Sequence, residues 1–260
     1  MSSEIQQSSP IDLESARSRL RSARALVCDI DGVLLMCGQP VPGAKALLET
    51  HRCVFVSNNS THTAEELSQV FHRLGLPSDS RDFFLAGEAA IDFVAGTNPE
   101  ASVMVLASGG IEARAQEKLN VFNLSQLSAS ERPDLLLLCR DEGATFEKIE
   151  AAANAVRLGA RIILSNPDLT HPAADGMIHT ETGALWAAIR AQIESTEPFA
   201  VIGKPNAALV ERAVRHLGFR PSELVFLGDN LMTDAPAAAE AGIPFIHTGG
   251  AGFRLLDLVD

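Results

Sequence analysis

The chain has 260 residues, of which 46% are hydrophobic, which is enough for a large core and for one or two domains. Its 21 Lys and Arg against 33 Asp and Glu give a formal net charge of −12, which argues against nucleic-acid binding because that function needs a basic surface. No apolar run is long enough to cross a membrane. From the charge and from the apolar runs together, we expect neither nucleic acid nor a membrane as a partner.

The N-terminus and the cysteines indicate a cytoplasmic protein. Residues 1–20 are mostly polar and are predicted to form a flexible tail, without the apolar core of a signal peptide. The four cysteines are scattered without a Cys-x-x-Cys pair, and three of them fall in predicted strands: Cys28, Cys53 and Cys139. This pattern is typical of small core residues and predicts neither a disulfide scaffold nor a zinc site.

Strand and helix patterns alternate along the chain. Apolar runs predict strands at Ala25–Ile30, Cys53–Ser57, Ser102–Ala107, Asp134–Cys139, Arg161–Ser165, Phe199–Ile202, Leu224–Leu227 and Pro244–His247. Between them, Thr63–Leu74 begins with a capping box formed with Glu66, and Asn206–Leu217 has an apolar face and stops at Gly218. The alternation predicts an α/β protein with a doubly wound, largely parallel sheet.

The segments that carry chemistry lie early, at residues 29–60, and late, at residues 203–234. A long middle stretch with its own strand–helix–strand pattern separates them. The simplest organisation is therefore a core domain of residues 21–84 and 198–260 with a cap domain of residues 85–197 inserted into it. The predicted strands are compatible with one sheet or with two.

The first chemical motif is Asp29-Ile30-Asp31-Gly32, which follows a strand that is apolar on both faces. Ligands of parallel sheets bind at the carboxyl ends of the strands, where these carboxylates stand. One Asp can attack a phosphorus atom, the other can exchange a proton with the leaving oxygen, and Gly32 lets the chain turn. A turn without chemistry is the alternative. An EF-hand calcium loop is excluded, because its later ligand positions would be Val33, Leu35, Cys37 and Pro40.

Three further strands end in polar residues. Ser57-Asn58-Asn59 offers a hydroxyl and backbone N–H groups to phosphate oxygens, or else a helix cap or Asx turn. Lys204 can neutralise a phosphate and a carboxylate together, or else be a solvated lysine. Asp229 and Asp234 can hold Mg²⁺, or Asp234 can be a helix cap. Together with the first motif, these segments supply every component of phosphoryl transfer, which favours the catalytic interpretation.

In this order the motifs resemble those of the haloacid dehalogenase superfamily, from about residue 25 to 250. Three further features resemble its NagD-like subfamily with a large α/β cap: Val41-Pro42-Gly43-Ala44, the Ser-Asn-Asn form of the second motif, and Ser165-Asn166-Pro167-Asp168. The resemblance implies a Rossmann-like core with an inserted α/β cap domain. Ser165 replaces the usual Thr, and Glu181-Thr182-Gly183 replaces a glycine-rich turn, which leaves the substrate open.

The resemblance also implies roles for individual residues. Asp29 would be the nucleophile that forms an aspartyl-phosphate, and Asp31 the general acid and base. Ser57 and Lys204 would complete the catalytic set by holding the phosphoryl oxygens and stabilising their charge. Mg²⁺ would be bound by Asp29, the backbone carbonyl of Asp31, Asp229 and, in support, Asp234. The residues expected to bind the substrate are Gly32, Ser57, Asn58, Asn59, Asn166, Asp168 and Lys204. For Asn166 and Asp168, the expected role is to contact the substrate or to fix a specificity loop, and a plain Asn-Pro-Asp turn is the alternative.

Asp31 favours a phosphomonoesterase over a dehalogenase, because an alkoxide leaving group needs a proton and a halide does not. We therefore expect a Mg²⁺-dependent phosphatase of a small phosphorylated metabolite: a nucleotide, a sugar phosphate, phosphoglycolate or pyridoxal phosphate. A non-catalytic phospho-ligand-binding protein on the same fold is the alternative. His171 and His179 are substrate contacts or solvent-exposed loop residues, and Trp186 packs in the core or in a dimer contact. A homodimer through the cap is implied by the family alone.

Overall fold

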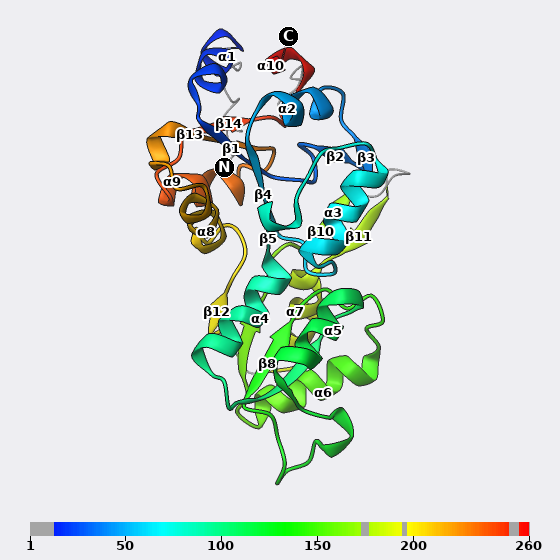
Figure 1. Cartoon of the computed structure of the whole chain (residues 1–260). Coiled ribbons are helices and arrows are strands. Elements are labelled where there is room, and N and C mark those ends of the chain that lie inside the picture. The colour runs from blue at the N-terminus through cyan, green and yellow to red at the C-terminus, as the bar shows by residue number, and fades with distance from the viewer. Residues whose placement is uncertain (1–12, 173–176, 194–196, 250–254, 260) are drawn as a thin grey trace, which may run out of the picture.

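The computed structural model describes residues 13–172, 177–193, 197–249 and 255–259, and its strands form two large sheets (Figure 1). The first sheet has the order β14-β13-β1-β4-β5 and the second the order β12-β9-β8-β6-β7. Every pairing within both sheets is parallel. Of the one-sheet and two-sheet arrangements that the sequence allows, the structure has the second.

The strands of the first sheet are β1 (Ala25–Cys28), β4 (Cys53–Ser57), β5 (Phe83–Leu85), β13 (Leu224–Gly228) and β14 (Phe245–His247). Those of the second are β6 (Ser102–Leu106), β7 (Asn120–Val121), β8 (Leu135–Leu138), β9 (Arg161–Leu164) and β12 (Ala200–Val201). Two small antiparallel hairpins join β2 (Leu35–Met36) to β3 (Gln39–Pro40) and β10 (Thr170–Pro172) to β11 (Ile178–Thr180). Short 3-10 helices lie at η1 (Ser80–Asp82), η2 (Leu124–Gln126) and η3 (Pro221–Glu223).

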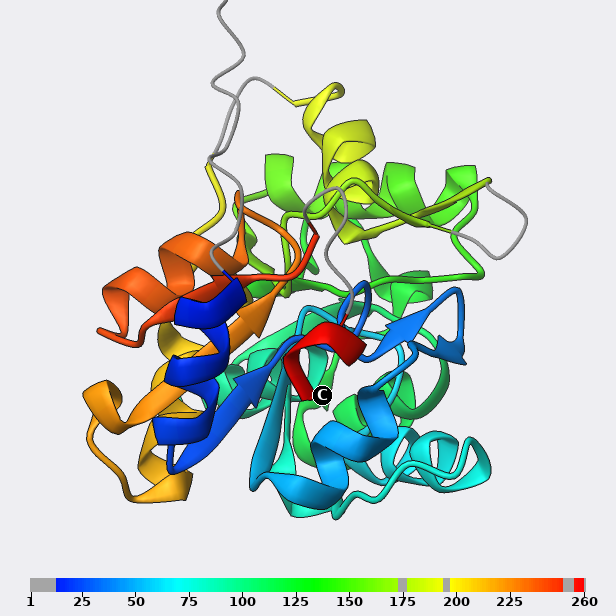
Figure 2. The same ribbon diagram turned by 90° about the horizontal axis from the view of Figure 1, so that it is seen from above.

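Helices cover both faces of the first sheet (Figure 2). One face packs against α1 (Leu13–Ser22), α2 (Ala44–Thr50), α3 (Ala64–Arg73) and α10 (Leu256–Val259), and the other against α8 (Ala208–Leu217) and α9 (Asp234–Glu240). Strand β1 shows how the sequence achieves this, because its side chains alternate between faces. Leu26 and Cys28 pack in the apolar cluster on the side of α1, α2, α3 and α10, and Ala25 and Val27 pack in the cluster on the side of α8 and α9. The doubly wound sheet predicted from the sequence is confirmed.

The second sheet is covered in the same way. Helices α4 (Ala86–Thr97) and α5 (Gly109–Lys118) pack on one face, and α6 (Phe146–Arg157) and α7 (Thr182–Arg190) on the other. Trp186 of α7 is 7% exposed and packs with Leu185 and Ile189 in the apolar cluster between the second sheet and the helices α6 and α7. The core-packing interpretation of Trp186 therefore holds.

The chain passes between the sheets twice. It leaves the first sheet where β5 runs into α4, and it returns between β12 and Lys204. Because β12 pairs with β9, the predicted boundary at residue 198 falls before the last strand of the second sheet, not after it. Ala86 and Ile202, at the two crossings, belong to one apolar cluster that spans both sheets. We propose that the two sheets are the predicted core and cap domains, with the return crossing after Val201.

Several local predictions can be compared with the structure. The capping box of α3 is present, since Thr63 Oγ1 accepts from Glu66 N at 3.2 Å and Glu66 Oε2 accepts from Thr63 N at 2.8 Å. Residues 13–20, predicted to belong to a flexible tail, lie instead in α1, because Ala16 and Leu20 bury an apolar stripe. Residues 1–12 of that tail lie outside the described residues. Within the described ranges, no helix is both long and apolar enough to span a membrane.

Candidate active site

Three adjacent parallel strands end at the same edge of the first sheet. Cys28 of β1 is in register with Phe55 of β4 on one side and Leu227 of β13 on the other. Asp29 and Asp229 directly follow β1 and β13, and Ser57 is the last residue of β4, so these three residues come together at one sheet edge. The convergence can be predicted from the sequence, because each apolar strand is followed by polar residues at its carboxyl end and parallel strands place these ends side by side.

Lys204 joins this group from the returning chain. Its Nζ lies 2.8 Å from Asp29 Oδ1 and 2.7 Å from Asp234 Oδ1. All three residues are buried, with Lys204 2% exposed, Asp234 0% and Asp29 8%. Burial opposes the charged form of Lys204, but Asp29 and Asp234 outweigh it and raise its pKa. The ammonium is therefore a fixed positive charge between two carboxylates.

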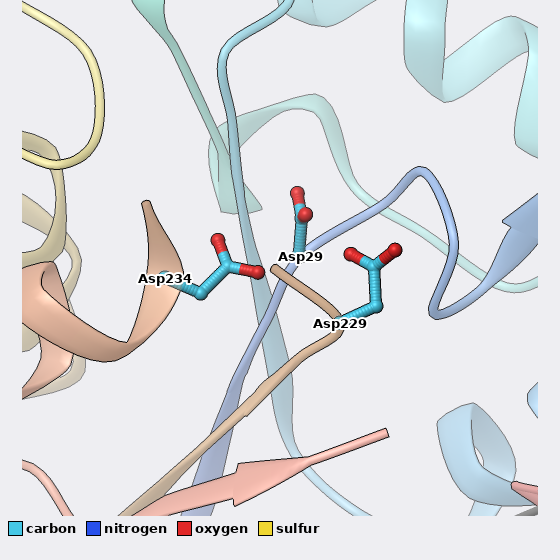
Figure 3. A group of neighbouring side chains, drawn as sticks. All are labelled: Asp29, Asp229 and Asp234. Atoms are coloured by element: carbon cyan, nitrogen blue, oxygen red, sulfur yellow. The ribbon is translucent and has the colours of Figure 1, made fainter. Parts of the chain in front are cut away.

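Asp29, Asp229 and Asp234 form a group of carboxylates (Figure 3), with ligand oxygens within 4.8 Å of one another. Their number exceeds the single ammonium of Lys204, so the site carries excess negative charge. Burial raises the pKa of Asp29 and of Asp229 above the ordinary value, and repulsion from Asp234 adds to both effects. Closely spaced hard oxygen donors with uncompensated charge suit Mg²⁺.

Gly32 leaves room for this group. Its φ is +82°, in the left-handed region that glycine adopts without strain. A Cβ at this position would overlap the Asp229 carboxylate, whose Oδ1 would lie only 3.0 Å away. The predicted turn after Asp31 is thus present, and the missing side chain of Gly32 is what lets Asp229 reach the site.

Asp31 stands apart from these three carboxylates. It is solvent-exposed, although the atoms packed around it raise the pKa of its carboxyl above the ordinary value. The nearby His171, Lys204 and His62 oppose that rise. Asp31 is therefore available to solvent and to a substrate, with a carboxyl that holds its proton more firmly than usual.

The loop after β4 uses its polar side chains in different ways. Ser57 Oγ accepts from Asn59 N at 3.1 Å. Asn59 Oδ1 accepts from the backbone N–H groups of Thr61 and His62 at 3.1 and 2.9 Å. Asn59, predicted to bind substrate, thus serves an Asx turn, the alternative weighed for this segment.

Asn58, Asn166 and Asp168 lie where the two sheets meet. Asn166 is 0% exposed, and its Nδ2 donates to Asn58 O at 2.8 Å. Asn58 Nδ2 donates to Asp168 Oδ2 at 2.8 Å. Because the fully buried Asn166 has no surface to offer a substrate, the structure favours the second of its two predicted roles, which is to fix a loop.

Three residues of this region were not predicted. The hydroxyls of Ser60 and Thr182 lie 3.1 Å apart and join the loop after β4 to the start of α7. Glu181 Oε1 lies 2.6 Å from His171 Nδ1, on the hairpin formed by β10 and β11. His179 is exposed, with its ring centroid 5.0 Å from that of His171. The replacement of a glycine-rich turn by Glu181-Thr182-Gly183 was the available signal.

Two family models match the chain. One, described as haloacid dehalogenase-like hydrolase, covers residues 26–118, and the other, described as HAD-hydrolase-like, covers residues 201–252. The chain is a haloacid dehalogenase-like hydrolase. The matched segments contain the strand ends and the lysine described above, and they leave out most of the second sheet.

Individual relatives agree with this assignment. The acid sugar phosphatase of Staphylococcus aureus is 27% identical over 233 residues, which span 88% of this chain and 87% of that protein. The glycerol phosphate phosphatase of Mycobacterium tuberculosis, solved with magnesium, has a TM-score of 0.80 and 26% identity over 93% of this chain and 78% of that one. NagD of Escherichia coli K-12 has a TM-score of 0.72 and 26% identity over 87% and 88%. The predicted family, its NagD-like type and the enzyme class are confirmed.

Proposed function

We propose that this hydrolase removes phosphate from small phosphomonoesters with the help of Mg²⁺, through an aspartyl-phosphate on Asp29. The observation that carries the proposal is the buried Lys204, whose ammonium lies 2.8 Å from Asp29 and 2.7 Å from Asp234. A ligand-binding protein would have no need of a carboxylate that contacts a buried ammonium at the end of a strand, with a second carboxyl two residues further on that can donate a proton. The alternative of a non-catalytic binder is therefore less well supported.

The residues divide the reaction between them. Asp29 attacks the phosphorus atom and forms a P–O bond, while the bond to the leaving alcohol breaks and Asp31 gives that alkoxide its proton. A water molecule then attacks the phosphorus, Asp31 takes the water's proton, and Asp29 is released with inorganic phosphate. The raised pKa of Asp31 suits the first of these steps.

Ser57 and Lys204 contact the phosphoryl oxygens in this proposal. Asp29, the backbone carbonyl of Asp31 and Asp229 would hold Mg²⁺, with Asp234 in support. When bound, the ion reduces the repulsion between Asp29 and a phosphate dianion.

The relatives support a particular range of substrates. One is named an acid sugar phosphatase and another a glycerol phosphate phosphatase, so phosphorylated sugars and polyols stand first among the predicted small metabolites. Nucleotides, phosphoglycolate and pyridoxal phosphate remain in the panel to be tested. A cytoplasmic location and a homodimer through the cap remain predictions.

The test is release of phosphate from p-nitrophenyl phosphate and from the panel, with and without EDTA. We expect metal-dependent release, a loss of at least ~10² in turnover for Asp31→Asn, and no covalent labelling of Asp29→Asn by radioactive substrate phosphate. Phosphate binding without any release would support the binder instead. Label that persists in Asp29→Asn would exclude Asp29 as the nucleophile.

A further inference from the structure

A buried polar junction connects the second sheet to the backbone of Lys204. Asn58, in the loop after β4, donates through the same Nδ2 to Asp168 Oδ2 at 2.8 Å and to the carbonyl oxygen of Lys204 at 3.0 Å. Asp168 follows β9 of the second sheet, while Lys204 provides the ammonium of the active site. One amide group thus joins the two sheets at the residue that neutralises Asp29.

The loops around Asn58 are held firmly. Asn166 Nδ2 donates to Asn58 O at 2.8 Å and lies 3.3 Å from Ser60 Oγ. Ser60 Oγ in turn accepts from the backbone N–H of Arg140 at 3.0 Å, in the loop after β8. These contacts fix the backbone of Asn58, so that its side chain has little freedom to turn toward a substrate.

The side chain of Asn58 is also oriented by Gly203. A Cβ on Gly203 would overlap Asn58 Oδ1 and would lie 2.8 Å from the carbonyl oxygen of Ser165. Asn58 Oδ1 is buried here and has no hydrogen-bond partner among the described residues. A flipped amide would lose both acceptors of Nδ2, so the observed orientation is the better one. An unpartnered buried acceptor is unfavourable and calls for a compensating role.

We propose that Asn58 and Asp168 are positioning residues that act through Lys204 and do not contact the substrate. Asp168 holds the amide of Asn58, the amide holds the Lys204 carbonyl, and the Lys204 ammonium then meets Asp29 and Asp234. This inference rests on the proposed phosphatase function and replaces the substrate-binding role expected for these two residues. A shift of about 1 Å in a group of this kind can cost about 100-fold in rate.

The positioning role and the substrate-binding role differ in their kinetics. If Asp168 bound the substrate, its loss would raise KM by amounts that differ between substrates. If it positions Lys204, its loss lowers kcat by the same factor for every substrate and leaves KM nearly unchanged. The chemical step slows because the charge beside Asp29 is misplaced.

The experiment compares Asp168→Ala, Asp168→Asn and Asn58→Ala in the full-length protein, with p-nitrophenyl phosphate and a panel of sugar phosphates. Asp168→Asn keeps a side-chain oxygen to accept from Asn58, so we expect near-normal kcat. Asp168→Ala and Asn58→Ala should each lose about 100-fold in kcat, and the double variant should lose no more than either alone. The control is Asp141→Ala, which removes a carboxylate paired with Lys148 at 2.7 Å in the second sheet's domain and should leave kcat unchanged.

The outcomes separate two failures. A wild-type protein that releases no phosphate from any substrate overturns the proposed function and this inference with it. An active wild type whose Asp168→Ala variant keeps its kcat, or shows a rise in KM that depends on the substrate, overturns the inference alone. Additive losses in the double variant would also overturn it, because they would show that Asn58 and Asp168 do not act together on Lys204. An equal loss in Asp141→Ala would overturn it as well, because a disturbance elsewhere in the second sheet's domain would then lower kcat just as much.

Discussion

A methyl group at position 32 should weaken the binding of Mg²⁺ at the proposed site. In Gly32→Ala, the new Cβ would overlap the Asp229 carboxylate and force that side chain away from Asp29. The backbone there has a φ of +82°, which costs a residue with a side chain about 1–2 kcal/mol. Two separable effects should follow: a loss of stability from the backbone, and a loss of Mg²⁺ affinity of at least ~10-fold, or about 1.4 kcal/mol.

Gly38→Ala is the matched control. Its φ is +73°, so the backbone penalty is similar, but nothing lies within 4 Å of the new Cβ. We therefore expect both variants to lose about 1–2 kcal/mol in denaturant unfolding, and Gly32→Ala alone to lose affinity in a titration with Mg²⁺. Normal Mg²⁺ affinity in Gly32→Ala, or an equal loss in Gly38→Ala, would refute the argument that Gly32 makes room for Asp229.

Three other changes test the electrostatics. Lys204→Met leaves two buried carboxylates without their cation and should lower the free energy of unfolding by about 3–5 kcal/mol; a urea curve that matches the wild type would contradict the buried ion pair. Mg²⁺ at 100 times its Kd should raise that free energy by about 2.7 kcal/mol in the wild type, and by much less in Asp229→Asn. Partial burial raises the pKa of Asp92, but the nearby positive charges of Lys118 and Arg212 outweigh burial and lower that pKa below its ordinary value. This pair of contacts should therefore stabilise the fold above pH ~4, by at most about 1 kcal/mol because the groups are part-exposed, and lose that effect as the pH falls further. The measurement is the free energy of unfolding of Asp92→Asn and of the wild type at several pH values. A destabilisation by Asp92→Asn that grows as the pH falls would contradict this prediction.

The sequence predicted the strand ends well because their chemistry is local. An apolar run followed by an acidic residue predicts both where a buried strand ends and which chemical group lies at its end. Parallel pairing of the strands then brings these ends to the same edge of the sheet. Asp29, Asp229 and Lys204 therefore meet as expected. The capping box at Thr63 and Glu66 was predictable for the same reason, since both of its hydrogen bonds lie within one turn of helix.

The remaining features depend on contacts between distant segments. Strand β12 has only two residues, and its pairing with β9 decides which sheet it joins. Helix α1 looked like a polar tail, because Ala16 and Leu20 become recognisable as core residues only once a partner surface is known. Asn166 could not be told apart from a substrate contact, since its four acceptor contacts come from other loops or from neighbouring side chains.

The position of Lys204 shows how the two kinds of information combine. Its place at the end of an apolar strand is local, but that strand belongs to the second sheet while its ammonium serves the first. The lysine therefore stands where the chain crosses between the sheets, and any relative movement of the sheets acts on it directly. A site in which one ammonium contacts two of three clustered carboxylates is sensitive to such a shift, because charge interactions at 2.7–2.8 Å weaken as soon as the groups separate and water enters. This sensitivity gives the crossing a reason to be pinned by Asn58 and Asp168, which no pattern within either segment could have indicated.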